Sequence, residues 1–97
     1  MLGLKLTMPI TVKDAFAKLT ASKYELVMLH LNLPDGTGYD VMSFLKESDS
    51  QPSIIVISAY DNEVSDIMDK GASLFIAKPF TTKTVSKALK ALNFLPG

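Results

Sequence analysis

Residues 2–8 alternate between apolar and polar side chains, and the apolar positions are Leu2, Leu4, Leu6 and Met8. A period of two is typical of a β-strand that buries one face, so this pattern predicts a strand whose leucines face the core. Pro9 ends the strand, because proline cannot donate a backbone hydrogen bond to a neighbouring strand. Thr11 follows as a candidate helix N-cap, and Asp14 stands three residues later, as in a capping box.

The rest of the chain alternates between apolar runs and helical spacing. Strands are predicted at residues 24–29, 54–57 and 74–77, where apolar and β-branched side chains cluster. Helices are predicted at residues 12–19, at residues 39–46, after Asp61 or Asn62 up to Gly71, and from Thr81 to Leu92. Four strand–helix units in this order predict an α/β fold of three layers, in which a parallel sheet has helices on both faces.

The composition is that of one globular domain over residues 1–97. Apolar residues make up 47% of the chain, and ten basic residues balance ten acidic ones, so we expect no nucleic-acid or membrane partner. The absence of cysteine excludes disulfides and thiolate metal sites, and it fits a reducing compartment. The chain shows no leader and no apolar stretch long enough to span a membrane, so we expect a soluble, cytoplasmic protein.

Candidate chemistry lies at the carboxyl ends of the predicted strands, where open α/β sheets place their sites. Three polar residues stand at these ends: His30, which is the only histidine of the chain, Ser58 and Lys78. No second histidine and no carboxylate at a fixed helical spacing accompanies His30, so the pattern does not favour a metal site. Asp35 lies among turn-forming residues and is interpreted as a turn residue.

Three segments of the chain resemble the receiver domain of bacterial two-component response regulators. YELVMLHLNLPDGTG resembles the segment around the phospho-accepting aspartate, VISAY resembles the strand with the switch hydroxyl, and GASLFIAKPF resembles the end of the domain. The resemblance covers about residues 15–80 and the last helix. It implies a flavodoxin-like parallel sheet and a role in a phosphorelay rather than an enzymatic activity.

The resemblance also assigns roles to individual residues. It places the conserved hydroxyl at Ser58, followed by the small Ala59, and an invariant lysine at Lys78, followed by a usually cis proline at Pro79. These four residues would form the phosphate pocket of the domain. A switch aromatic would stand at Phe75, and the backbone carbonyl of Asn32 would be a magnesium ligand.

Two departures from the family pattern change this expectation. The phospho-acceptor position holds His30 in place of aspartate, and the first strand–helix unit of the family, with its acidic pair, has no counterpart. A receiver needs a carboxylate nucleophile, and magnesium prefers carboxylate and water oxygens. We therefore expect a degenerate pocket with no catalytic residue, no cofactor and no magnesium ion.

The missing unit matters for the sheet as well, because the family's first strand is central. Three outcomes are open: the strand at residues 2–8 moves into the central slot, two chains complete each other, or an upstream piece has been lost. The alternation of residues 2–8 argues against the central slot, because central parallel strands are apolar on both faces. We therefore expect a homodimer or a partner-bound state, formed through the open sheet edge or through the last strand and its flanking helices.

Each candidate residue also has a structural interpretation. His30 is read first as a neutral plug of the pocket, because the nearby lysine disfavours a protonated imidazole. Ser58 is read as a strand-end hydroxyl with a local bond, Phe75 as a core aromatic, and Lys83, Lys87 and Lys90 as a solvated helix face. The functional hypothesis is a truncated pseudo-receiver that works by protein–protein contact. The alternatives are a phosphoryl carrier at His30, and a fragment or altered version of a working receiver.

Overall fold

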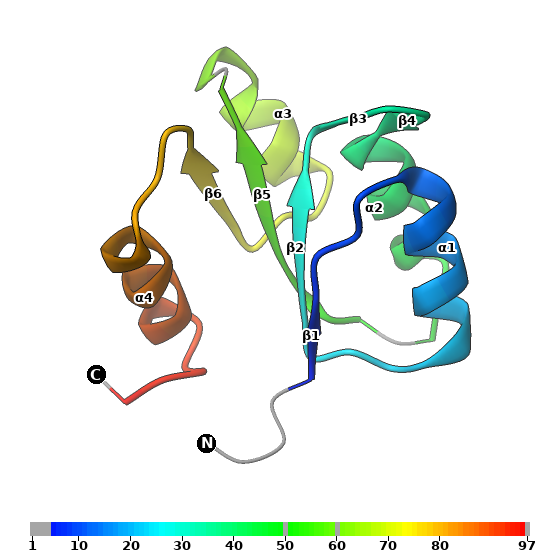
Figure 1. The fold of residues 1–97 in the computed structure, drawn as a ribbon, viewed down its shortest axis with the longest axis horizontal. Coiled ribbons are helices and arrows are strands. Elements are labelled where there is room, and N and C mark those ends of the chain that lie inside the picture. Colours follow the sequence, from blue (N-terminus) through cyan, green and yellow to red (C-terminus); the bar gives the residue numbers. More distant parts are fainter. Residues whose placement is uncertain (1–4, 50, 60, 97) are drawn as a thin grey trace.

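Four parallel strands form the central sheet of the computed structural model, which describes residues 5–49, 51–59 and 61–96. They are β1 (Leu6–Thr7), β2 (Leu26–His30), β5 (Ser53–Ser58) and β6 (Leu74–Ala77), in the spatial order β1-β2-β5-β6 (Figure 1). A small antiparallel hairpin of β3 (Asn32–Leu33) and β4 (Gly36–Thr37) follows β2. The predicted parallel α/β architecture is confirmed.

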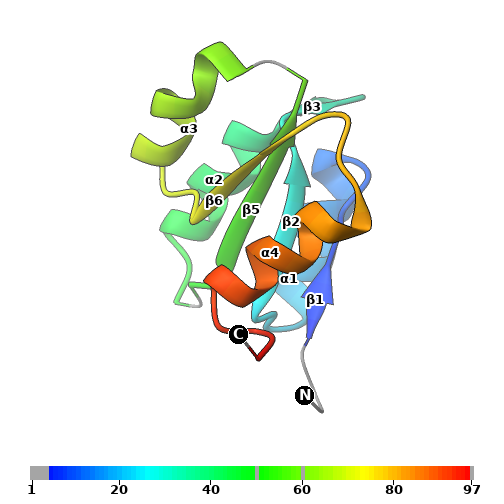
Figure 2. The same cartoon turned by 90° about the vertical axis from the view of Figure 1, so that its left-hand side faces the viewer.

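The helices follow the strands in the predicted order. They are α1 (Val12–Ala21), α2 (Gly38–Lys46), α3 (Val64–Asp69), which follows a 3₁₀ turn η1 (Asp61–Glu63), and α4 (Thr82–Ala91). Figure 2 shows α4 in front of the sheet, with α1 and α2 behind it. The three layers expected from the strand–helix alternation are therefore present.

The start of α3 differs from the prediction, which placed its N-cap at Asp61 or Asn62. These residues lie in η1, and the N-cap of α3 is Glu63, whose side chain makes no capping hydrogen bond. A 3₁₀ turn tightens the chain ahead of the helix and takes up the positions that the cap was expected to fill. At the other end of α3 the prediction is confirmed, because Gly71 has a φ of 113°, which favours glycine.

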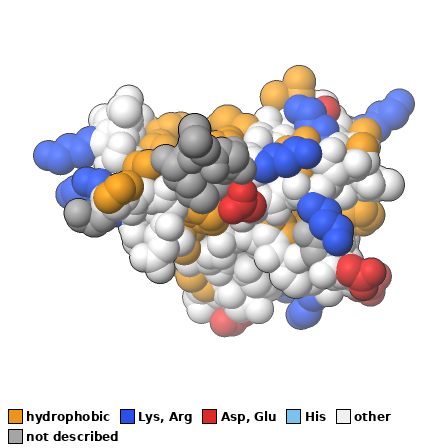
Figure 3. Space-filling model, turned by 90° about the horizontal axis from the view of Figure 1, so that it is seen from below, with side chains coloured by type: hydrophobic (Ala, Val, Ile, Leu, Met, Phe, Trp, Pro, Cys, Tyr) orange, Lys and Arg blue, Asp and Glu red, His pale blue; other side chains and the backbone are white. Residues whose placement is uncertain are grey.

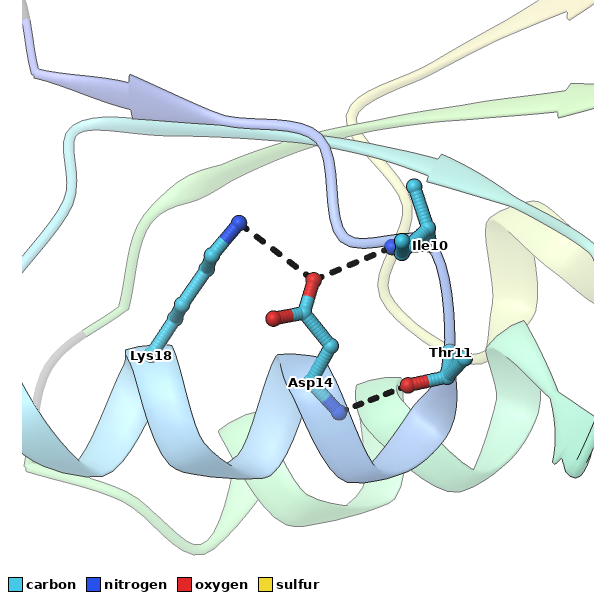
Figure 4. A network of polar contacts seen from close by, with 4 residues as sticks. All are labelled: Ile10, Thr11, Asp14 and Lys18. Atoms are coloured by element: carbon cyan, nitrogen blue, oxygen red, sulfur yellow. Dashed lines mark hydrogen bonds and ion pairs between the residues drawn. The ribbon is translucent and has the colours of Figure 1, made fainter.

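The polar contacts at the start of α1 explain why the helix begins where the sequence predicts. The Oγ1 atom of Thr11 accepts a hydrogen bond from the Asp14 N–H at 2.8 Å. The Oδ2 atom of Asp14 accepts from the Ile10 N–H at 3.2 Å and lies 3.3 Å from the Lys18 ammonium (Figure 4). Two backbone donors that have no partner inside the helix are thus satisfied by side chains.

The core is divided by the sheet into two clusters. The larger cluster lies under α1, α2 and α3, and it includes Ala15, Leu29, Val41, Val56 and Ile67. The smaller cluster lies under α4, and it includes Leu26, Met28, Ile55, Ile57 and Ala88. Alternate residues of β2 and β5 face opposite clusters, as the side-chain period of a strand requires.

The first strand buries the opposite face from the one that its sequence pattern predicts. Thr7 is 6% exposed and Pro9 is buried, whereas Leu6 is 44% exposed and Met8 is 38% exposed. Leu6 is in register with Leu26, whose side chain belongs to the cluster under α4. The even positions therefore face the thinly covered side of the sheet, and Leu2 and Leu4 lie outside the described residues.

Of the three outcomes left open for the sheet, the structure shows the first strand in the slot beside β2, which the alternation of residues 2–8 argued against. β1 pairs directly with β2, with Leu6 opposite Leu26 and Thr7 opposite Val27. The Lys5 carbonyl also accepts a hydrogen bond from the Glu25 N–H at 2.8 Å. Pairing the backbone groups along β2 outweighs the polar alternation of the first strand, because unpaired donors and acceptors in a sheet are costly.

Candidate functional site

The carboxyl ends of three neighbouring strands bring the predicted site residues to one edge of the sheet. His30, the last residue of β2, is in register with Ile57, and Ser58, the last residue of β5, is in register with Ala77. The Lys78 N–H donates a hydrogen bond to the Ser58 carbonyl at 2.9 Å. The ladder thus places His30, Ser58 and Lys78 at the ends of three adjacent strands, with Lys78 directly after β6.

The His30 side chain is half-buried, and its Nδ1 atom is buried without a hydrogen-bond partner among the described residues. Burial lowers the pKa of His30 below its ordinary value, and the positive charge of Lys78 lowers it further. Both effects disfavour the imidazolium form. Both causes favour the neutral form of His30 at pH 7, and among the described side chains Lys78 is the charged group that shifts its pKa.

The other predicted site residues differ in their exposure. Ser58 is 3% exposed, whereas Ala59, Lys78 and Pro79 are exposed. The Lys78–Pro79 peptide bond is cis, as the resemblance implied. Phe75 is half-buried in β6 and packs against the larger core cluster. The packing of Phe75 agrees with its interpretation as a core aromatic.

Asp35 has a role that the sequence did not indicate. Its Oδ1 atom accepts a hydrogen bond from the Val12 N–H at 2.6 Å, and its Oδ2 atom accepts from the Lys13 N–H at 3.0 Å. These two bonds lower the pKa of Asp35. The carboxylate thus holds the N-terminus of α1 against the hairpin that follows His30, where a negative charge is favourable.

The hairpin packs closely against both α1 and β2. A Cβ atom at Gly36 would lie 2.9 Å from a methyl carbon of Val12, and a Cβ atom at Gly38 would lie 3.0 Å from the His30 carbonyl oxygen. The Gly38 N–H donates to the Leu31 carbonyl at 2.7 Å. Glycine at residue 38 allows α2 to start directly against the end of β2.

The described side chains near His30 are not the ones that typically bind a magnesium ion. Among the side chains described in residues 5–49, 51–59 and 62–96, no three His, Asp or Glu residues gather closely enough to hold a metal. Both carboxylate oxygens of Asp35 accept hydrogen bonds from α1. The charged neighbour of His30 is a lysine. Magnesium takes hard oxygen ligands and is bound through carboxylates, whereas a neutral imidazole suits other metals.

Comparison with known proteins identifies the family. The model of the response regulator receiver domain matches residues 3–90, which is most of the chain. The chain therefore belongs to the response regulator receiver domain family. Among the described residues, no helix has the length and apolar character needed to cross a membrane.

Individual relatives agree with this assignment. The swarming motility regulation protein RssB of Serratia marcescens is 33% identical over 84 residues, which cover 84% of this chain and 38% of that protein. The response regulator TrrA of Thermotoga maritima, solved in complex with Mg²⁺–BeF, has a TM-score of 0.71 at 25% identity. The match covers 82% of this chain and 70% of the TrrA chain. The non-phosphorylated HemR receiver domain of Leptospira biflexa has a TM-score of 0.76 at 27% identity, and the match covers 91% of this chain and 73% of the HemR chain. The chain spans about a third of the length of the curated relatives it matches.

Proposed function

We propose that this chain is a pseudo-receiver, a receiver domain that acts through protein–protein contact without phosphorylation at the acceptor position. The observation that supports the proposal is the neutral, half-buried His30 at the end of β2, beside Lys78. An aspartyl phosphate cannot form on an imidazole, and the buried Nδ1 atom is not placed for attack on a phosphoryl donor.

Loss of magnesium binding is part of the same proposal. Phosphoryl transfer depends on a divalent ion to neutralise the charge that develops on the transferred oxygens. The described residues near His30 provide a lysine and a hydroxyl, and Asp35 is engaged by α1. A site without a carboxylate nucleophile and without a metal has neither of the two groups that the reaction requires.

Phosphorylation can be tested on the full chain with acetyl phosphate and Mg²⁺, followed by intact mass spectrometry. We expect no phosphoryl adduct, and we expect no change in the amide signals of Ser58 and Lys78 when beryllofluoride is added. An adduct stable to base but labile to acid would support the alternative of a phosphoryl carrier at His30. Any adduct, or a beryllofluoride-dependent change at Ser58, would contradict the proposal.

The contact surface that we propose for a second copy of the chain is the exposed face of the first strand. Leu6, Met8 and Ile10 are 44%, 38% and 72% exposed, although each is a large apolar side chain. Leu6 lies in β1, and Met8 and Ile10 follow in the connection to α1, where they alternate with the buried Pro9. An apolar strip of this kind is typical of an interaction site, and two uncharged strips can pack together without burying an unpaired charge.

A matched pair of methionines tests this surface against the alternative one, formed by β6 with α3 and α4. Met8 and Met68 are 38% and 40% exposed, and Met68 lies on α3. We expect Met8→Lys to shift the protein to monomer in sedimentation equilibrium, while Met68→Lys leaves self-association unchanged. If only Met68→Lys dissociates the dimer, the dimer uses the surface around α3. If the unmodified chain is monomeric at all concentrations, the proposed dimer does not exist.

A further inference from the structure

A surface groove of about 700 Å³ opens between the last turns of α1 and α2. These turns lead into β2 and β5, so the groove lies at the edge where the strands begin, opposite the edge that holds His30. Figure 3 views the molecule from this end and shows basic and acidic side chains close together on its right, with apolar atoms between them. The groove is thus separate from the receiver site.

The inner part of the groove is apolar. Leu19 of α1 and Phe44 of α2 are half-buried there, and both pack against the larger core cluster. The ring of Phe44 lies 4.9 Å from the ring of Phe16, measured between centroids, and the two rings are tilted by 33°, so Phe44 is in contact with a second aromatic side chain. A face of this kind can receive an apolar side chain, and an aromatic ring also attracts a cation.

The rim of the groove is acidic on the α2 side. Glu47 and Asp49 line it and are exposed, while Lys23 lines the α1 side. Both helices end at the groove, and the carboxyl end of a helix has a partial negative charge from its last carbonyl groups. At the end of α2, the carbonyl of Leu45 and that of Ser48, which follows the helix, accept hydrogen bonds from the Gln51 amide at 2.9 Å. Among the residues that line the groove, two carboxylates therefore face one lysine.

We propose that this groove docks a peptide segment of a partner protein in which a basic side chain stands next to an apolar one. The apolar side chain packs on Leu19 and Phe44, and the basic group lies between Glu47 and Asp49. Charge complementarity of this kind directs binding and makes it sensitive to salt. The groove gives the domain a partner surface whose use does not depend on the chemistry of His30.

The test uses the full ¹⁵N-labelled chain and two tetrapeptides, acetyl-Lys-Leu-Lys-Phe-amide and its acidic counterpart acetyl-Glu-Leu-Glu-Phe-amide. We expect the basic peptide to shift the amide signals of Ser22, Glu47 and Asp49 in a saturable way that weakens with salt. The acidic peptide should bind much more weakly. Because an exposed ion pair contributes about twofold in affinity, Glu47→Gln with Asp49→Asn should weaken binding about fourfold.

Lys23→Gln is the matched variant of opposite sign. It removes the one positive charge of the rim, so it should strengthen binding of the basic peptide about twofold. Equal binding of the two peptides would overturn the proposal. Signal changes confined to other parts of the chain would do so as well, and so would an unchanged affinity in the Glu47/Asp49 double variant.

Discussion

The two faces of the sheet are built from the same strands but are covered very differently. Behind the sheet, α1, α2 and α3 bury the larger core cluster, which extends from Val12 to Ala72. In front, among the described residues, α4 is the only helix (Figure 2). Its inward-facing Val85 and Leu89 are only half-buried, and Leu6 and Met8 on the same side are exposed. One face is closed, and the other is open beside α4.

This difference separates two requirements of an α/β sheet, the pairing of its backbone groups and the covering of its side chains. The backbone ladder is continuous from β1 to β6, so pairing of peptide groups does not require a further strand. Covering the side chains of the front face depends on α4, which is the one helix there among the described residues, and β1 adds no such cover. Hydrogen bonding in the sheet and burial of its faces are thus satisfied independently, because a strand can satisfy peptide groups without covering apolar area.

The largest expected effect contrasts two fully buried leucines of β2. Leu29 lies in the larger cluster and Leu26 in the smaller one, and both have no exposed area. We expect Leu29→Ala to lower the free energy of unfolding by about 4 kcal/mol and Leu26→Ala by about 2.5 kcal/mol, because the thinly covered face can collapse further into the cavity. Urea denaturation measures both, and equal losses would mean that the two faces are packed equally well.

The sequence was a good guide wherever a single periodicity decided the structure. The strands at β2, β5 and β6 and the helices α1, α2 and α4 lie where apolar runs and helical spacing predicted them, because each pattern matches one buried face. The cap at Thr11 was visible for the same reason, since its partner Asp14 is only three residues away. The meeting of His30, Ser58 and Lys78 followed from strand order alone.

The sequence was a poor guide wherever the answer depended on distant parts of the chain. Asp35 binds α1 across 23 residues, so nothing local marks its carboxylate as more than a turn residue. The first strand has an alternation that specifies one buried face, but which side of the sheet is covered depends on the helices that follow. A one-residue change of register exchanges the two faces of a strand, so the pattern alone could not choose between them.

A smaller contrast compares the two threonine caps on opposite faces. Thr11 accepts from the Asp14 N–H at 2.8 Å on α1, whereas Thr81 accepts from the Thr84 N–H at 3.3 Å on α4 and is exposed. We expect Thr11→Ala to cost about 1.5 kcal/mol of unfolding free energy and Thr81→Ala about 0.5 kcal/mol. Thermal or chemical denaturation of both variants checks the order. A larger cost at Thr81 would show that the open face depends on its helix more than its packing indicates.

Asp35 offers a pH-dependent test of the closed face. Its pKa is lowered in the folded state, so the carboxylate stabilises the fold above its ordinary pKa of 3.8, and this contribution is lost as pH falls below that value. We expect Asp35→Asn to lower the thermal midpoint at pH 7, and the two proteins to converge in strongly acidic solution. Asp69→Asn is the control. Asp69 is exposed at the end of α3, so this change should have little effect on the thermal midpoint. A constant difference at all pH values would show that the charge of Asp35 is not what holds α1.

The smallest effect concerns His30, whose pKa is lowered by burial and by Lys78. Below pH 6.5 the unfolded chain takes up a proton that the folded chain refuses, so stability should decrease as pH falls from about 7.5 to 5.5. Because His30 is the only histidine of the chain, its imidazole ring signals in NMR spectra report this titration directly. Lys78→Gln should raise the pKa of His30 and flatten the slope, while Lys83→Gln on α4 should leave both unchanged. A pKa of His30 above 6.5 would mean that an acidic group lies beside the acceptor position, and the argument for a pocket without carboxylates would then fail.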